Sequence, residues 1–77
     1  MFTIKVRPNP VDDVLTVAGL APGSHLCLID AAGKVVADVI TTQTTQEIDM
    51  RELTRAAYIL QVLYDNRMVK SVQLTKT

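Results

Sequence analysis

The run Tyr58-Ile-Leu-Gln-Val-Leu-Tyr64 restricts the fold more than any other segment, because it is apolar on both sets of alternating positions. Its even-numbered residues are aliphatic or aromatic, and its odd-numbered residues are aliphatic except for Gln61. Tyr, Ile and Val favour a pleated surface, and the flanking segments are too short to extend the run into a helix. We therefore predict a central β-strand over this run.

A second apolar run, from Met68 to Leu74, follows Asp65-Asn66 at the spacing of a β-hairpin. These two runs predict an antiparallel hairpin at the C-terminal end of the sequence. On the other side of the central strand, the chain enters from a corner between Leu53 and Arg55, and Tyr58 is the first strand residue. This placement predicts a tyrosine corner, in which the ring packs into the core and the hydroxyl bonds backbone at the turn.

Five further segments have the length and the apolar alternation of short strands. They are Phe2 to Val6, Val14 to Val17, Leu26 to Ile29, Val35 to Ile40 and Glu47 to Met50. The seven segments recur about every ten residues with turn signals between them, and no stretch has the pattern of a long amphipathic helix. We predict an all-β fold, a small immunoglobulin-like antiparallel β-sandwich of about seven strands, because so few strands barely close a barrel around side chains.

The length of 77 residues is enough for one small hydrophobic core and leaves no room for a second domain. We therefore treat residues 1–77 as one domain. Ordering the chain costs conformational entropy at every residue. Nearly all of the hydrophobic residues, 48% of the chain, have to be buried to offset that cost, which leaves few for a ligand pocket.

Charge and hydropathy argue against two classes of partner. Eight basic residues balance eight acidic ones and are scattered singly, so nucleic acid is not an expected partner. No apolar run reaches the ~20 residues that span a bilayer, and no N-terminal export signal precedes the first strand. We expect no membrane span, and we expect Thr77 to be a native C-terminal end.

Three turns carry specific expectations. In Pro8-Asn9-Pro10, the prolines fix φ at both ends, and we expect the Asn9 side chain to close a local turn on the backbone. Gly33 follows Asp30-Ala31-Ala32 and is expected to adopt a positive φ that reverses the chain into a second hairpin. Thr41 to Gln46 is expected to be a polar loop, and we interpret it as a linker rather than a sugar-binding site because it has no aromatic residue to stack on a sugar ring.

No group of residues predicts catalysis, a cofactor or a metal. Asp12 and Asp13 are adjacent and would point to opposite faces of a strand, so we interpret them as solvated turn residues. Cys27 lies within an apolar strand and is expected to be a buried structural thiol that forms no internal disulfide. His25 opens that strand without a nearby Cys, Asp or Glu at ligand spacing, so we expect a surface histidine.

The order of these signals resembles the C-terminal sorting domain of the type IX (Por) secretion system over almost the whole chain. The matching segments are Val6-Arg7-Pro8-Asn9-Pro10, Val14 to Val17, Leu28-Ile29-Asp30 with Gly33-Lys34-Val35-Val36, Ile48-Asp49-Met50 with Leu53, Tyr58 to Val62, and the strand from Lys70 to Lys76. No single motif is specific, but their order and spacing are. The chain departs from the family at Arg55-Ala56-Ala57, where a Gly usually precedes the position of Tyr58.

The resemblance implies a non-enzymatic signal domain of Bacteroidota. A separate signal takes the cargo to the periplasm, and the domain directs it through the outer-membrane translocon to the cell surface or the medium. A sortase then usually removes the domain and joins the cargo to anionic lipopolysaccharide. The positions that carry the family motifs, and hence the expected recognition residues, are Pro8, Asn9, Pro10, Gly33, Lys34, Tyr58, Lys70 and Lys76.

Two other functions are compatible with the same residues. One is a retained sorting-like domain that docks a secretion-system component or presents lipopolysaccharide to the sortase. The other is a carbohydrate-binding or adhesive β-sandwich, with Thr41 to Gln46 and the loop at Asp12-Asp13 as its binding end. In neither case does the sequence predict a catalytic centre.

Overall fold

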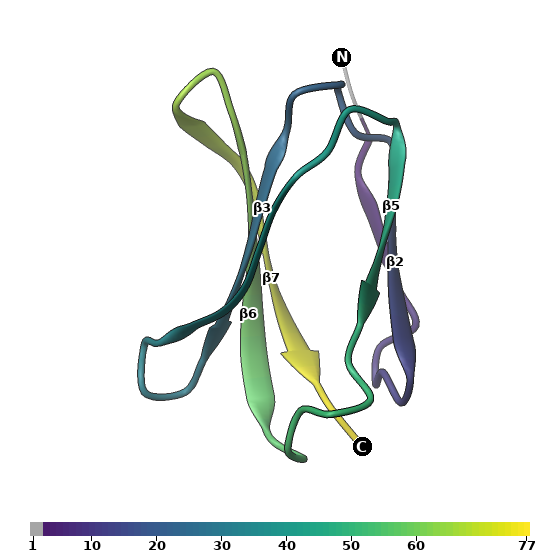
Figure 1. Cartoon of the computed structure of the whole chain (residues 1–77), viewed down its shortest axis with the longest axis vertical. Helices are drawn as coiled ribbons and strands as arrows, with labels where there is room; N and C mark the ends of the chain where they lie inside the picture. The colour runs from purple at the N-terminus through teal and green to yellow at the C-terminus, as the bar shows by residue number, and fades with distance from the viewer. Residues whose placement is uncertain (1–2) are drawn as a thin grey trace.

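Seven β-strands account for the regular structure in the computed structural model, which describes residues 3–77 (Figure 1). They are β1 (Lys5–Arg7), β2 (Val14–Ala18), β3 (His25–Asp30), β4 (Val35–Ile40), β5 (Thr45–Asp49), β6 (Ala57–Tyr64) and β7 (Arg67–Thr75). Phe2, part of the first predicted strand, lies outside the described residues. No helix long and apolar enough to cross a membrane is found in the described part of the chain.

The strands form two antiparallel sheets that face each other (Figure 1). One sheet has three strands in the order β1-β2-β5, and the other has four in the order β4-β3-β6-β7. The predicted antiparallel β-sandwich of seven strands is confirmed. Two separate sheets, rather than one closed barrel, allow each sheet to bury one face against the other.

Strand β6 is central in the four-stranded sheet, as predicted, with β3 on one side and β7 on the other. Its residues Tyr58, Leu60 and Val62 are buried, because they face the three-stranded sheet. Its other face points to solvent, where Ile59 is 41% exposed. The apolar residues on both faces therefore correctly indicate a central strand, but only one of the two faces packs in the hydrophobic core.

The core is built by alternate residues of both sheets. The large apolar side chains that are at most 5% exposed are Val11, Leu15, Val17, Leu20, Leu26, Leu28, Ile48, Met50, Tyr58, Leu60, Val62 and Leu74. At least one of them comes from each of β2, β3, β5, β6 and β7, which ties the two sheets together.

Both hairpin turns have the backbone geometry that their residues favour. Asp65 and Asn66 have φ values of 54° and 61°, so the two-residue turn between β6 and β7 matches the right-handed twist of the strands. Gly33 has a φ of 85°, which confirms the predicted positive φ in the turn between β3 and β4. Only the first of these turns has non-glycine residues at positive φ, which Asp and Asn tolerate.

The predicted loop from Thr41 to Gln46 is shorter than expected. Thr45 and Gln46 belong to β5, so the loop covers 41–44 only. Thr41 is buried, and its hydroxyl accepts a hydrogen bond from the Gln43 backbone N–H at 3.1 Å. The predicted extent of the loop was wrong because Thr residues suit strands as well as turns, and pairing of Ala18 with Thr45 places Thr45 in a strand.

Candidate functional site

The last strand, β7, is held at its C-terminal half by a segment from the other end of the chain. Asn9 Nδ2 donates a hydrogen bond to the Gln73 carbonyl at 3.0 Å, and Asn9 Oδ1 accepts one from the Thr75 N–H at 3.2 Å. The expected local turn at Asn9 is therefore wrong. Among residues 3–77, no strand lies beside the outer edge of β7, so its backbone groups need other partners, and the Asn9 amide supplies two of them.

Val11 also pairs with the outer edge of β7 through its backbone. Its N–H donates to the Thr75 carbonyl at 2.9 Å, and its carbonyl accepts from the Thr77 N–H at 2.9 Å. Val11 thereby makes a parallel bridge with Lys76, and its side chain is fully buried. Within the described residues, no strand pairs with the outer edge of β7 between Arg67 and Val72, so that part of the edge faces solvent.

The predicted tyrosine corner at Tyr58 is confirmed. The side chain of Tyr58 is buried, and its hydroxyl donates to the Thr54 carbonyl at 2.7 Å. The Thr54 hydroxyl lies 3.2 Å from the same oxygen. One residue before β6, the Ala56 carbonyl accepts a hydrogen bond from the Lys76 N–H at 2.9 Å. The corner therefore holds the start of β6 and the end of the chain together.

The two lysines of the C-terminal motif have different environments. Lys70 is exposed on β7, where its charge is available to a partner. Lys76 is only 7% exposed, and its Nζ donates to the Thr77 carbonyl at 2.8 Å. Its aliphatic stem therefore contributes to packing at the end of the sandwich, and the two lysines do not form one positive patch.

The turn at Gly33-Lys34 is organised by an acidic side chain. Asp30 Oδ1 accepts hydrogen bonds from the backbone N–H groups of Ala32 and Lys34, each at 2.9 Å. Asp30 pairs with Tyr58 in the register of β3 and β6, which brings this turn beside the tyrosine corner. Residues of both segments line one open hollow of about 370 Å³.

The sandwich thus brings most of the expected recognition residues to one end. Asn9, between Pro8 and Pro10, contacts the end of β7, and Lys76 directly follows that strand. Tyr58, at the start of β6, and the turn with Gly33 and Lys34 lie at the same end of the sheet. Lys70 lies farther back along β7, where it pairs with Val62. The chain terminates at this same end of the molecule, at the bottom of Figure 1.

Cys27 is not buried in the core as expected. Leu26 and Leu28 occupy the core face of β3, so the alternation of the strand directs Cys27 to the outer face, where it is half-buried. Burial raises the pKa of its thiol, and the negative charge of Asp38 raises it further. Both effects disfavour the thiolate, so Cys27 lacks the lowered pKa of an activated nucleophile.

His25 also has neighbours that sequence reasoning missed. Its Nε2 contacts Asp38 Oδ1, and it lies 3.4 Å from Cys27 Sγ. Cys27 is two residues from His25 on the same face of β3, and Asp38 is opposite Cys27 on β4. The expectation of a histidine without nearby ligands was wrong, because the partner acid comes from the neighbouring strand. The spacing His-x-Cys was the only signal in the sequence.

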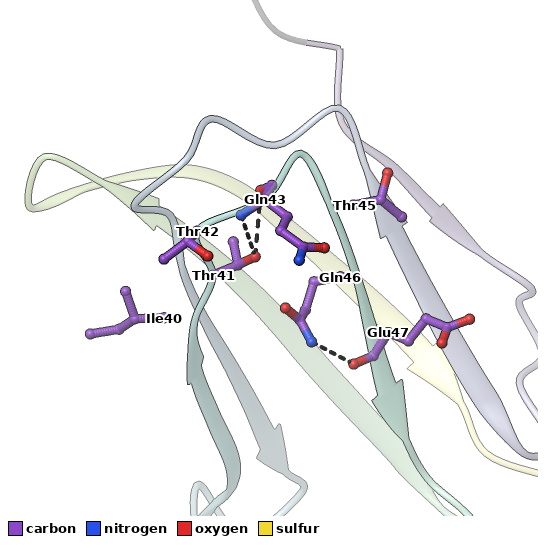
Figure 2. Close-up of a pocket in the computed structure, with 7 residues that line it drawn as sticks. All are labelled: Ile40, Thr41, Thr42, Gln43, Thr45, Gln46 and Glu47. Atoms are coloured by element: carbon purple, nitrogen blue, oxygen red, sulfur yellow. Dashed lines mark hydrogen bonds between the residues drawn. The ribbon is translucent and has the colours of Figure 1, made fainter.

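The loop between β4 and β5 borders an open hollow (Figure 2). The residues that line it are Ile40, Thr41, Thr42, Gln43, Thr45, Gln46 and Glu47. Asp12 and Asp13 do not contribute, because they precede Val14, which pairs with Asp49, whereas Ala18 at the far end of β2 pairs with Thr45. The two loops of the adhesive hypothesis therefore lie at opposite ends of the sheet.

Comparison with known proteins agrees with this architecture. The family model described as "Secretion system C-terminal sorting domain" matches residues 5–75. Among solved structures, this chain is similar to part of PorZ, with a TM-score of 0.84 and 20% identity. PorZ is described as an essential surface component of the type-IX secretion system of Porphyromonas gingivalis. The match covers 96% of this chain and 11% of that one, so this chain corresponds to about a tenth of the solved protein's length. No curated protein matches the sequence.

The family match extends from β1 to the end of β7 and includes every strand of both sheets. It also includes the Pro8-Asn9-Pro10 segment, the Gly33 turn and the tyrosine corner, which the fold collects at one end. The chain belongs to the C-terminal sorting domain family of the type IX secretion system.

Proposed function

We propose that this sorting domain is read by the translocon and the sortase through the outer edge of β7, between Arg67 and Val72. A sorting domain of this family directs a protein to the cell surface or out of the cell, and such domains are in general not enzymes. The observation that carries the proposal is the contrast along one edge. Asn9 and Val11 cover the edge from Gln73 to Thr77, and the backbone groups of the remainder have no strand partner in the part of the chain that the structure describes.

An open strand edge can accept a further strand from a partner protein, because its N–H and C=O groups already lie at strand spacing. Natural proteins usually protect such edges, and here β7 is nine residues long. Met68 and Val69 are each 52% exposed on this segment, which adds apolar contact area, and Lys70 adds a positive charge. A partner strand would therefore gain both backbone hydrogen bonds and side-chain contacts.

We further propose the route that the family resemblance implies. A separate signal takes the cargo to the periplasm, and the domain then acts at the outer membrane. The sortase removes the domain and joins the cargo to anionic lipopolysaccharide. In this scheme, Lys70 contacts the secretion machinery directly. The other expected recognition residues act by fixing the end of β7, and they are Pro8, Asn9, Pro10, Gly33, Lys34, Tyr58 and Lys76.

Ser71 allows a specific test of the edge. Gln73 and Thr75 direct backbone groups to the outer edge, and alternate residues of a strand point to the same edge, so Ser71 does as well. Ser71→Pro removes one outward N–H without removing a bond to β6. Ser71→Ala is the matched control because it changes the same exposed side chain and retains the N–H.

Circular dichroism of the purified domains would show whether each variant folds. Each variant would also be fused to an exported cargo, and cells that express the fusion would be fractionated to locate the cargo. We expect both domains to fold, the Ser71→Ala cargo to reach the surface, and the Ser71→Pro cargo to accumulate in the periplasm. Normal surface delivery with Ser71→Pro would reject the edge as the recognition surface. Normal delivery after deletion of Ser71 to Thr77 would reject the sorting function itself.

A retained sorting-like domain is the second candidate. It is favoured by the likeness to part of PorZ, which is described as a surface component of the secretion system. The two candidates differ in the fate of these residues. Mass spectrometry of the parent protein at the cell surface would detect peptides from residues 1–77 if the domain is retained, and would not detect them after sortase cleavage.

A further inference from the structure

The outer face of the four-stranded sheet carries three metal-ligating side chains of different chemistry at one place. They are the imidazole of His25, the thiol of Cys27 and the carboxylate of Asp38. Their nitrogen, sulfur and oxygen atoms all lie within 4.8 Å of one another. We propose that these residues form a binding site for a zinc-type divalent cation, with a water molecule as the fourth ligand.

The backbone positions of the three residues are set by strand pairing. His25 and Cys27 are separated by one residue on β3 and so share a face of the sheet. Asp38 is directly opposite Cys27 on β4. Side chains at directly opposed positions have Cβ atoms about 5 Å apart, which is close enough to share one ion. Ligands on paired strands are held more firmly than ligands on loops.

The distance between the two stronger ligands fits tetrahedral coordination. Zinc binds imidazole nitrogen at about 2.0 Å and thiolate sulfur at about 2.3 Å, so at a tetrahedral angle the two atoms are about 3.5 Å apart. Cys27 Sγ and His25 Nε2 are separated by 3.4 Å. The Asp38 side chain is 58% exposed and has room to turn its carboxylate towards an ion between them.

The ligand chemistry selects the class of metal. A nitrogen, a sulfur and one carboxylate oxygen are typical zinc ligands, whereas calcium and magnesium take sets of oxygen ligands. Three protein ligands leave the fourth position open, and the His25 side chain is 37% exposed, so water can reach the ion. A thiolate and a carboxylate would together neutralise the two positive charges of the metal.

The surrounding residues do not compete with a cation. In the register of the sheet, His25 pairs with Ile40 on β4 and with Leu63 on β6. Cys27 pairs with Gln61 on β6. None of these neighbours carries a positive charge that would repel the ion or already occupy the carboxylate. A bound ion would connect β3 to β4, which is an edge strand.

The test uses the untagged, reduced 77-residue chain, which contains a single His and a single Cys. Isothermal titration with Zn²⁺ is expected to give one site per chain, and Co²⁺ is expected to give a tetrahedral absorption spectrum with a thiolate charge-transfer band. Zn²⁺ is expected to raise the Tm by mass action, whereas Mg²⁺ and Ca²⁺ leave it unchanged.

The variants His25→Gln, Cys27→Ser and Asp38→Asn are each expected to lower the Zn²⁺ affinity at least tenfold, with circular dichroism confirming the fold. The control Asp12→Asn changes an exposed acid away from this face and should bind like the parent chain. A Co²⁺ spectrum without the thiolate band, or unchanged affinity in any of the three variants, would overturn the site. The cluster would then be an ion pair between His25 and Asp38 with a neighbouring thiol.

Discussion

Asn9 Oδ1 accepts a hydrogen bond from the backbone N–H of Thr75, a residue 66 positions later in the chain. The same side chain donates to the carbonyl of Gln73. One amide group thus pairs with two backbone groups of the last strand, as a neighbouring strand would. This arrangement connects the segment after β1 to the end of β7 and closes one end of the sandwich.

Replacing Asn9 should therefore loosen the end of β7. Asn9→Ala removes both hydrogen bonds, and we expect a loss of roughly 1–2 kcal/mol in the free energy of unfolding. Asn9→Asp retains the acceptor for Thr75 but loses the donor for Gln73, so its loss should be smaller. Urea denaturation of the three proteins measures both differences. Equal stability of Asn9→Ala and the parent chain would contradict the proposed connection.

Two glycines with positive φ should respond differently to the same substitution. A Cβ at Gly19 would lie 2.0 Å from the Thr3 carbonyl oxygen, whereas a Cβ at Gly33 would meet nothing within 4 Å. Gly33→Ala should cost about 1 kcal/mol for its backbone conformation alone. Gly19→Ala should cost at least about 2 kcal/mol more, because the backbone of Thr3 has to move. Thermal denaturation of the pair tests this, and equal losses would contradict it.

The two tyrosines offer a test of the corner. Tyr58→Phe removes the hydroxyl that donates to the Thr54 carbonyl, so we expect a loss of about 1 kcal/mol in the free energy of unfolding. Tyr64→Phe is the matched control, because that side chain is 43% exposed at the other end of β6. Its stability should stay within about 0.5 kcal/mol of the parent chain. A larger loss for Tyr64→Phe than for Tyr58→Phe would reject the stabilising role of the corner.

Substitutions of Lys70 and Lys76 should distinguish a side chain that stabilises the fold by packing from one that contributes an exposed charge. Lys76→Gln shortens a side chain that is 7% exposed, so we expect a loss of about 1 kcal/mol in stability. Lys70→Gln removes an exposed charge and should leave stability unchanged. If cargo export nevertheless falls with Lys70→Gln, the lysine contacts a partner. The measurements are urea denaturation of the domains and fractionation of cells expressing the fused cargo.

An exposed ion pair predicts a specific pH dependence. Arg51 forms hydrogen bonds to Asp49 through its side chain and its backbone N–H, and these lower the pKa of the Asp49 carboxyl to about 2. A lowered pKa in the folded state favours folding above the ordinary value of 3.8. The contribution is lost as the pH falls from about 4 through about 2. NMR titration of the Asp49 carboxyl should find this pKa.

Arg51→Gln should return the Asp49 pKa towards 3.8, the ordinary value for the group. Arg55→Gln removes another exposed arginine of the same segment and should leave the Asp49 pKa near 2. An unshifted Asp49 pKa in Arg51→Gln would show that the guanidinium is not the cause.

Much of the fold can be predicted from the sequence, because strands and turns depend on neighbouring residues. The alternation in Tyr58 to Tyr64 identifies a strand, Asp65-Asn66 and Gly33 suit the turns that follow strands, and Tyr58 stands where a tyrosine corner requires it. These features need no knowledge of distant segments. The count of seven strands and the two-sheet sandwich follow from them.

The arrangement of the candidate sites was decided by tertiary structure. Asn9 was expected to bond locally, yet its partners lie 64 and 66 residues away, and burial of Lys76 depends on the segment that covers the end of β7. No local pattern reports such pairings, because the unpaired edge exists only after the sheets have formed.

A β-bulge illustrates the same limit at the proposed metal site. Ile29 pairs with Val35, and regular pairing from there would place Ala37 opposite Cys27. The register shifts by one residue between Leu28 and Ile29, so Asp38 takes that position and joins His25 and Cys27. The sequence determined that His25 and Cys27 share a face, since side chains alternate along a strand. Only the folded hairpin decided that an acid faces them, because a bulge depends on how two strands pair and twist.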